Sequence, residues 1–305
     1  MRILIAIGIV VAAFVGTLLV RHLLDMPAEN VPLIITEKPC NRIICLSPGL
    51  TETVFALGLG SKVVGVTRFC LYPPEARNCP DIGGFLDPNY EAIVALRPDI
   101  VFLTPYQREL MRDLQRLGVN TCTVLQDSLA DILDSYRQIG ALCNCREAAE
   151  TLTAELHTCL DRMKQQTQDK TALRLLLTTG RDVRTGKLDE VYAVGHGTFL
   201  DELITLLGCE NIAPGNLLEY PSVSVEGILR LDPDIIIELV ADMEYDSTIE
   251  KTALQAWKSL TNLRAARENK VHVLFGNYLT IPGPRVVLTL EALSRCLKSS
   301  MDAIQ

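Results

Sequence analysis

The sequence predicts an α/β protein with two similar lobes joined by one long helix. A helix–corner–strand stretch that begins at Glu91 recurs from Glu226 at one constant offset, with Pro-Asp at both corners. Proline disfavours helical backbone in the residue before it, so each helix should stop there and the β-branched run that follows should be a buried strand. Apolar, strand-like segments also alternate with helical ones, as in parallel sheets covered by helices. A third observation is a long helical pattern midway between the two copies.

Length and charge agree with this organisation. A chain of 305 residues suits two domains better than one, because single cores stop growing at roughly 250–300 residues. The formal net charge is -8, whereas proteins that bind nucleic acid carry an excess of basic side chains to neutralise phosphates. We therefore expect no nucleic-acid partner.

The N-terminal segment predicts export. Residues 3–20 carry no charged side chain and are bracketed by Arg2 and Arg21. This run reaches the ~18 residues that indicate a membrane span and is longer than the ~7–15 apolar residues of a cleaved signal peptide. We interpret residues 1–25 as an uncleaved signal-anchor, with a cleaved signal peptide as the alternative, and residues 26–41 as a tether. The remainder should be periplasmic or otherwise extracytoplasmic, anchored to the inner membrane through residues 3–20.

Residues 42–143 are predicted to form the first lobe. The apolar runs are expected to be strands at 42–46, 63–66, 100–103 and 121–125. Helices are expected at 51–57, 107–117 and 129–142, the first of them starting near Thr51 and ending at Gly58. The stretch between the second strand and Glu91 is rich in Pro, Gly and aromatic residues and should be a long loop.

Residues 144–170 are predicted to contain the connecting helix. Apolar side chains recur every three or four positions from residue 146 to 166, which makes one helical stripe. About 21 residues give a helix of ~32 Å, long enough to cross from one lobe to the other; an ordinary surface helix is the alternative. Residues 171–305 then restart the alternation, with strands at 173–177, 235–239 and 271–275 and helices at 198–207, 254–260 and 284–303.

Ten cysteines in an exported chain suggest disulfides. Cys40/Cys45 and Cys70/Cys79 are close enough in sequence to pair, although spacing alone does not fix the connectivity. Cys143-x-Cys145 has no second pair and no histidine at zinc-site spacing, so we expect no metal site there.

No catalytic motif is present: there is no G-x-S-x-G elbow, no H-E-x-x-H and no dinucleotide fingerprint. We therefore expect no catalytic residue, no enzymatic activity and no cofactor. His196, between two glycines, is the one histidine in a flexible loop, and it is either a ligand contact or a plain turn residue. Asp99 and Asp234 follow the prolines of the two corners and are expected to close their turns by local hydrogen bonds.

Glu91 and Glu226 head the two helices of the repeat. They could simply be stabilised there by the helix dipole. Two equivalent, outward-pointing carboxylates would also suit a partner with paired arginines, because Arg–carboxylate pairs are bidentate and directional.

Several stretches together resemble one protein family. They are 43–52 with 55–58, 64–67 with 72–75, 82–84, both repeat copies, 197–201 with 208–212, and Pro284-Arg285. From about residue 41 to the C-terminus the chain resembles the periplasmic substrate-binding proteins of iron-siderophore and cobalamin ABC importers, with the cobalamin-binding branch closest. The resemblance implies two Rossmann-like lobes, a rigid connecting helix, a ligand cleft between the lobes and a protein that is otherwise monomeric.

The resemblance also implies functional residues. A glutamate on each lobe of such proteins docks onto arginines of the permease dimer, and the matching positions are Glu91 and Glu226. Ligands of such proteins lie against aromatic side chains, and the matching positions are Phe69, Phe85 and Tyr220, with Tyr192 and Tyr278 nearby in looser alignment. Tyr106 and Arg181 could instead serve an anionic siderophore, and His196 is the remaining candidate ligand-binding residue. Several large indoles expected of a cobalamin site are Phe or Tyr here, and no lipoprotein cysteine adjoins the membrane run. Cobalamin or another corrinoid, a ferric siderophore and haem stay open as ligands, and a chelatase-like enzyme or a tethered sensor without a transport partner are the alternatives.

Overall fold

The computed structural model describes residues 40–167, 172–188, 191–215 and 218–302, all of which belong to one compact unit, Thr36–Gln305. The predicted signal-anchor and the tether up to residue 39 lie outside the described residues. Within the described part of the chain, no helix has both the length and the apolar character needed to cross a membrane.

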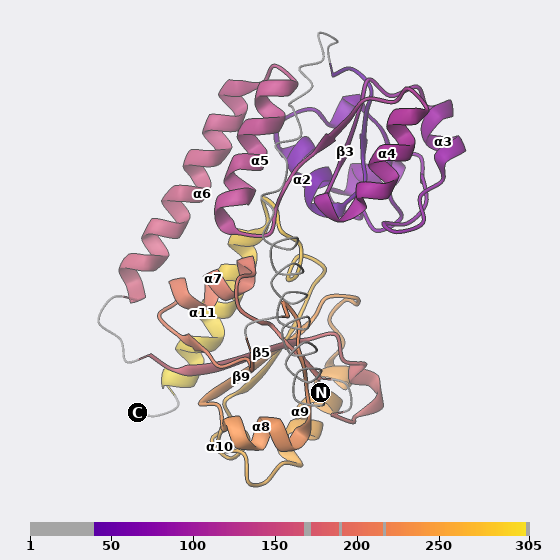
Figure 1. The fold of residues 1–305 in the computed structure, drawn as a ribbon. Coiled ribbons are helices and arrows are strands. Elements are labelled where there is room, and N and C mark those ends of the chain that lie inside the picture. Colours follow the sequence, from indigo (N-terminus) through magenta and orange to yellow (C-terminus); the bar gives the residue numbers. More distant parts are fainter. Residues whose placement is uncertain (1–39, 168–171, 189–190, 216–217, 303–305) are drawn as a thin grey trace, which may run out of the picture. The chain divides into compact units, whose positions relative to one another are not determined.

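The first lobe is built on a four-stranded parallel sheet with the order β2-β1-β3-β4. The strands are β1 (Ile43–Cys45), β2 (Val63–Val66), β3 (Ile100–Leu103) and β4 (Thr121–Thr123), and the main helices are α2 (Pro48–Ala56), α3 (Tyr90–Ala95), α4 (Arg108–Arg116) and α5 (Leu129–Leu142). Alternate strand residues face opposite sides of a sheet. Phe102 therefore packs with α2 and α5, whereas Val101 packs with α3 and α4, and Figure 1 shows these helices on the two sides of β3.

The second lobe contains a six-stranded sheet in which β10, β9 and β5 are parallel and β6 runs antiparallel to both β5 and β8. The strands are β5 (Arg174–Thr179), β6 (Val191–Ala193), β7 (Glu210–Asn211), β8 (Ser222–Val223), β9 (Ile235–Val240) and β10 (Val271–Phe275), and the helices are α7 (Phe199–Leu206), α8 (Val225–Leu231), α9 (Ser247–Lys258), α10 (Arg264–Arg267) and α11 (Val286–Asp302). The predicted fold class is confirmed. The antiparallel edge was not predicted, because strands of two or three residues leave no periodic signal.

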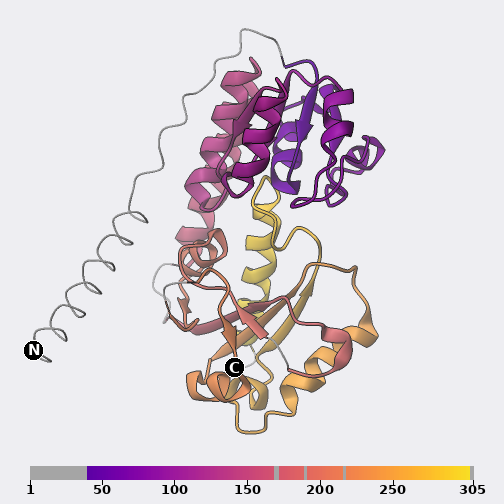
Figure 2. The same cartoon turned by 45° about the vertical axis from the view of Figure 1, so that its right-hand side comes forward.

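The helix α6 (Arg146–Thr167) connects the lobes. Its buried stripe includes Ala149, Leu156 and Met163, and it packs on α5 of the first lobe and on α7 and α11 of the second. Its close approach to α5, visible in Figures 1 and 2, depends on Gly140, because a Cβ atom there would collide with that of Ala149.

One disulfide joins Cys40 to Cys143, with a Cα–Cα distance of 5.1 Å. The suggested pairs Cys40/Cys45 and Cys70/Cys79 are wrong in this structure. Cys45 ends a central strand and is buried in the core of the first lobe, whereas Cys143 follows α5 and faces the start of β1.

We expect the free energy of unfolding of the double variant Cys40→Ser/Cys143→Ser to be about 2–5 kcal/mol lower than that of the wild type, because the disulfide constrains a long segment of the unfolded chain. Urea unfolding followed by tryptophan fluorescence measures this loss. A reductant should lower the stability of the wild type to that of the variant, and an equally stable variant would contradict the assignment.

Candidate functional site

The two repeat copies adopt the same local structure. Arg97 and Asp232, which precede the two prolines, both have left-handed backbone with φ of 46° and 41°. In the first copy the Oδ2 atom of Asp99 accepts hydrogen bonds from the backbone N–H groups of Asn41 and Arg42, both at 3.0 Å. In the second copy Oδ2 of Asp234 accepts from the N–H of Arg174 at 2.9 Å. The aspartates therefore hold the start of each lobe's first strand rather than closing their own turns, which corrects the prediction of local bonding.

An arginine completes each of these contacts. Arg42 donates from Nη2 to the carbonyl of Leu96 at 2.6 Å, and Arg174 donates from Nη2 to the carbonyl of Leu231 at 2.8 Å. Carbonyls at a helix C-terminus have no partner within the helix, so a guanidinium there satisfies them. The Pro-Asp corners are scaffold.

Glu91 and Glu226 are exposed in the first turns of α3 and α8. The helices are capped by other residues: the side chains of Asn89 and Ser224 accept hydrogen bonds from the backbone N–H groups of Ala92 and Gly227. Among the described residues, no hydrogen bond or ion pair engages the carboxylate of either glutamate. Capping therefore does not account for these two side chains, which are available to a partner.

Four of the predicted aromatic residues lie on loops that hydrogen bonds tie together. The N–H of Arg68 donates to the carbonyl of Gly83, which joins the loop of Phe69 to that of Phe85. Gln107 donates from Nε2 to the carbonyl of Phe85 at 2.8 Å, which joins that loop to Tyr106. We refer to Phe69, Phe85, Tyr106 and Tyr220 as the aromatic site. The first three follow the carboxyl ends of β2 and β3, where open α/β sheets bind their ligands.

Tyr106 connects the two lobes at the aromatic site. Its hydroxyl donates to Oδ2 of Asp127 at 2.8 Å and lies 3.5 Å from Oε1 of Glu219, which precedes Tyr220 in the second lobe. Burial, and then the hydrogen bond and charge of Asp127, raise the pKa of Tyr106 well above its usual value. The hydroxyl of Tyr106 has one proton, which it donates to Asp127. The carboxylate of Glu219 therefore keeps its capacity to accept hydrogen bonds from another group at this point.

Of three further candidate ligand-binding residues, one lies close to the aromatic site and two are half-buried elsewhere in the second lobe. His196 is close to the aromatic site, because the N–H of its neighbour Gly195 donates to the carbonyl of Glu219 at 2.7 Å; its own Nδ1 lies 3.4 Å from Oδ1 of Asp201. Tyr192 lies half-buried on β6. Tyr278 lies half-buried after β10, beside Arg285.

Arg181 is not placed to bind a ligand, which corrects the prediction. Its side chain is 1% exposed, and Nε and Nη2 donate to the two carboxylate oxygens of Glu238 at 2.7 and 2.6 Å. The remaining Nη1 donates to the carbonyl of Lys187, and the indole of Trp257 also donates to Glu238. The guanidinium is thus held inside the second lobe.

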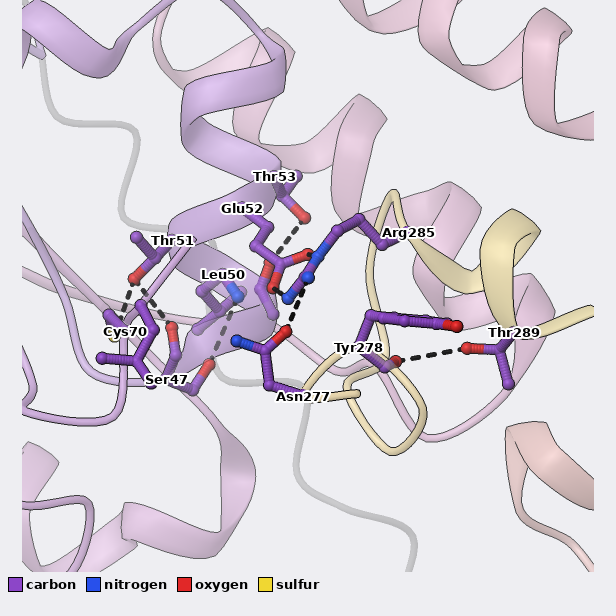
Figure 3. A network of polar contacts seen from close by, with 12 residues as sticks. Ser47, Leu50, Thr51, Glu52, Thr53, Cys70, Asn277, Tyr278, Arg285 and Thr289 are labelled. Carbon is purple, nitrogen blue, oxygen red and sulfur yellow. Dashed lines mark hydrogen bonds and ion pairs between the residues drawn. The ribbon is translucent and has the colours of Figure 1, made fainter. Parts of the chain in front are cut away.

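A second buried ion pair crosses between the lobes and was not predicted. Glu52 of α2 accepts from Nη2 and Nε of Arg285, at 2.6 and 2.8 Å, across 233 residues of sequence. Figure 3 shows this pair together with Asn277, whose Oδ1 accepts from Nη1 of Arg285 at 2.8 Å. Burial raises the pKa of Glu52, and Arg285 opposes that shift. The sequence signals were Thr51-Glu52 and Pro284-Arg285, which belong to the family-like motifs but carry no sign that they meet.

Three of the arginines discussed above lie beside carboxylates. Arg68, next to Phe69, lies 3.4 Å from Asp87, while Arg181 and Arg285 are held by Glu238 and Glu52. Among the described residues there is also no group of three or more His, Cys, Asp and Glu side chains that could hold a metal ion. The aromatic site thus has two hydrogen-bond acceptors, Asp127 and Glu219, beside Tyr106.

Comparison with known proteins gives one family. The family model described as periplasmic binding protein matches residues 43–277. The uncharacterized ABC transporter substrate-binding lipoprotein YvrC of Bacillus subtilis is 24% identical over 281 residues, covering 88% of this chain and 83% of that protein.

Two solved structures show the same fold at similar identity. The periplasmic vitamin B12-binding protein BtuF of Vibrio cholerae is 25% identical with a TM-score of 0.72, covering 86% of this chain and 98% of that one. A periplasmic heme-binding protein from Pseudomonas aeruginosa is 26% identical with a TM-score of 0.70, covering 83% and 91%.

Proposed function

We propose that this chain, which belongs to the periplasmic binding protein family, captures a corrinoid between its two lobes and delivers it to a permease. Members of this family are the substrate-binding components of ABC importers and work with permease partners; they are binding proteins rather than enzymes. The finer assignment of ligand and docking residues is ours. The observation that carries it is the aromatic site, where Tyr106 of one lobe meets Glu219 of the other.

The aromatic site suits a large, flat ligand. Phe69 and Tyr106 are 54% and 59% exposed, and Tyr220 is 40% exposed, so each of these side chains is accessible to a ligand. Aromatic side chains contribute large apolar contact areas with few rotatable bonds, and binding sites combine such surfaces with a few polar groups that orient the ligand. A macrocyclic metal chelate has the flat face that these rings would cover.

Charge favours a corrinoid over haem. The edge of a corrinoid carries neutral amide groups that donate hydrogen bonds, whereas haem carries two propionate carboxylates. Asp127 and Glu219 offer acceptor oxygens beside Tyr106, and the nearby Arg68 already has a carboxylate neighbour. Like charges juxtaposed across an interface are unfavourable, so this edge would repel propionates and accept amide N–H groups. Haem is the second candidate, because a heme-binding protein is similarly related.

Delivery to the permease is assigned to Glu91 and Glu226, one on each lobe. Their exposure, and the capping of α3 and α8 by other residues, support a role in recognition. We place the folded part of the chain outside the cytoplasm, in agreement with its family and with the Cys40–Cys143 disulfide, since disulfides persist in oxidising compartments. Attachment to the membrane through residues 3–20 rests on the sequence.

Isothermal titration calorimetry with cyanocobalamin, haem and a ferric hydroxamate siderophore tests the proposal. We expect cyanocobalamin to bind, and Phe69→Ala and Tyr220→Ala to weaken its binding by about 10-fold each, as for aromatic anchors elsewhere. Leu117→Ala is the matched control, because Leu117 is also 54% exposed but lies after α4, at the opposite edge of the sheet. If the protein binds haem and does not bind cyanocobalamin, haem becomes the proposed ligand. If it binds none of the three compounds, the proposal of a metal-chelate ligand is rejected.

A further inference from the structure

The loop between β10 and α11, residues 276–285, reaches from the second lobe to the first, as Figure 2 also shows. We call it the junction loop. It begins beside Tyr278, one of the candidate ligand contacts, and ends on Arg285, which holds Glu52 of α2. One short segment thus carries both a candidate ligand contact and the ion pair between the lobes.

Arg285 fixes the junction loop at both of its ends. Its Nε and Nη2 atoms bind the two oxygens of Glu52, and its Nη1 atom returns to Oδ1 of Asn277, the residue before Tyr278. Bidentate Arg–carboxylate pairs are directional as well as strong. A displacement of Arg285 relative to α2 would therefore pull on Asn277 and on the backbone that bears Tyr278.

Ring contacts reinforce this geometry. The guanidinium carbon of Arg285 lies 4.2 Å from the ring centroid of Tyr72 in the first lobe and 5.9 Å from that of Tyr278 in the second. Both are within the range at which a cation is attracted to an aromatic face. The carbonyl of Tyr278 also accepts a hydrogen bond from Thr289 of α11 at 3.2 Å, as seen in Figure 3. The position of Tyr278 is thus set by Arg285 and by the helix that follows it.

Backbone packing makes the contact close. A Cβ atom at Gly49, in the first turn of α2, would collide with the carbonyl oxygen of Pro282 in the junction loop. The loop therefore presses directly on the helix that bears Glu52, with no side chain between them at that point. A displacement of α2 at Gly49 would therefore act directly on the backbone of the loop.

We propose that Arg285 is a positioning residue that couples the relative orientation of the two lobes to the placement of Tyr278 in the ligand site. Ligand contact with Tyr278 is then sensitive to the arrangement of the lobes, and the lobe arrangement is sensitive to ligand. The inference rests on the proposed function in one respect, that Tyr278 faces the ligand.

Two buried Arg–Glu pairs in the chain provide a matched comparison. Arg285–Glu52 crosses between the lobes, whereas Arg181–Glu238 lies within the second lobe, and both have bidentate geometry with distances of 2.6 to 2.8 Å. Arg285→Lys and Arg181→Lys keep the charge and remove the same fork geometry. If both pairs are only structural, the two variants should lower the melting temperature alike and neither should change ligand affinity. A change in ligand affinity in Arg285→Lys alone therefore indicates a positioning role.

Cyanocobalamin affinity is the first measurement. We expect Arg285→Lys and Glu52→Gln to weaken binding by about 10-fold, because a site loses affinity when its supporting contacts loosen, and Arg181→Lys to leave it unchanged. Tyr278→Ala should also weaken binding, and adding Arg285→Lys to it should cost little more, because coupled residues are not additive. Full additivity of these two changes, or unchanged affinity in both Arg285→Lys and Glu52→Gln, would overturn the inference.

The distance between the lobes in the absence of ligand is the second measurement. Spin labels carried by unnatural amino acids at Arg112 and Lys251, both exposed, avoid the native cysteines. Arg285→Lys should broaden the distance distribution relative to the wild type, and Arg181→Lys should not; an unchanged distribution for Arg285→Lys would overturn the inference. If the wild type binds no cyanocobalamin, the proposed function falls, and this distribution still decides whether Arg285 sets the orientation of the lobes.

Discussion

Reversing the charge at both Glu91 and Glu226 is expected to lower uptake of cyanocobalamin at least about 100-fold while the isolated protein still binds it. Each glutamate is exposed in the first turn of a helix that another side chain caps. If each pairs with an arginine of the permease, a reversal removes an attraction and adds a repulsion, and truncating one partner of a buried interfacial charge pair alone costs about 2–5 kcal/mol. Uptake into proteoliposomes that contain the permease complex of the same organism measures the effect.

The control is the double variant Glu109→Arg/Glu155→Arg, which changes the net charge equally on exposed positions of α4 and α6. It should leave uptake close to that of the wild type. Single reversals at Glu91 or Glu226 should fall between the wild type and the double variant. Normal uptake by the Glu91→Arg/Glu226→Arg protein would show that these two glutamates do not dock the protein onto the permease.

The second large effect is expected at Glu238. Its replacement by leucine leaves the buried guanidinium of Arg181 without its carboxylate and the indole N–H of Trp257 without its acceptor. Breaking a buried pair in this way costs about 3–5 kcal/mol of unfolding free energy. Urea unfolding can be followed by the fluorescence of Trp257, the only tryptophan in the sequence.

Two further variants define the cause of that loss. Arg181→Met/Glu238→Leu should recover much of the stability, because a buried ion pair replaced as a whole by apolar side chains is often neutral. Asp134→Ala, which breaks the exposed pair with Arg137, should change stability by less than about 1 kcal/mol. If Glu238→Leu lost no more unfolding free energy than Asp134→Ala, Arg181 would have found another partner in the variant.

Local patterns in the sequence predicted most of the fold. The strand at 100–103 and the helix at 129–142 have the predicted bounds, and α6 ends one residue beyond its predicted end. These elements depend on periodicity and capping, which neighbouring residues determine. The short strands β6 and β8 depend on pairing with β5 and with each other, so no local signal marked them.

The site was less predictable because its contacts are distant in sequence. The resemblance indicated Phe69, Phe85 and Tyr220, and Tyr106 was a separate candidate for an anionic ligand. Nothing local indicated that Tyr106 would meet Asp127 and Glu219. Arg181 was put forward as a cation for an anionic siderophore, but its guanidinium is held by Glu238. The sequence did contain one signal for this pairing, the carboxylate of Glu238 inside the apolar run of β9. A charged side chain in a buried strand requires a buried partner of opposite charge.

The Pro-Asp corners have a consequence for the order of folding. Asp99 closes a segment of 57 residues onto Arg42, and Asp234 closes one of 60 residues onto Arg174, so the two lobes meet nearly the same chain-entropy cost in fastening their first strands. Bringing Glu52 to Arg285 closes a segment of 233 residues, which costs about 1 kcal/mol more on the same logarithmic scale. Of the three closures, the ion pair between the lobes is thus the most expensive in chain entropy, and the two corners within the lobes cost less.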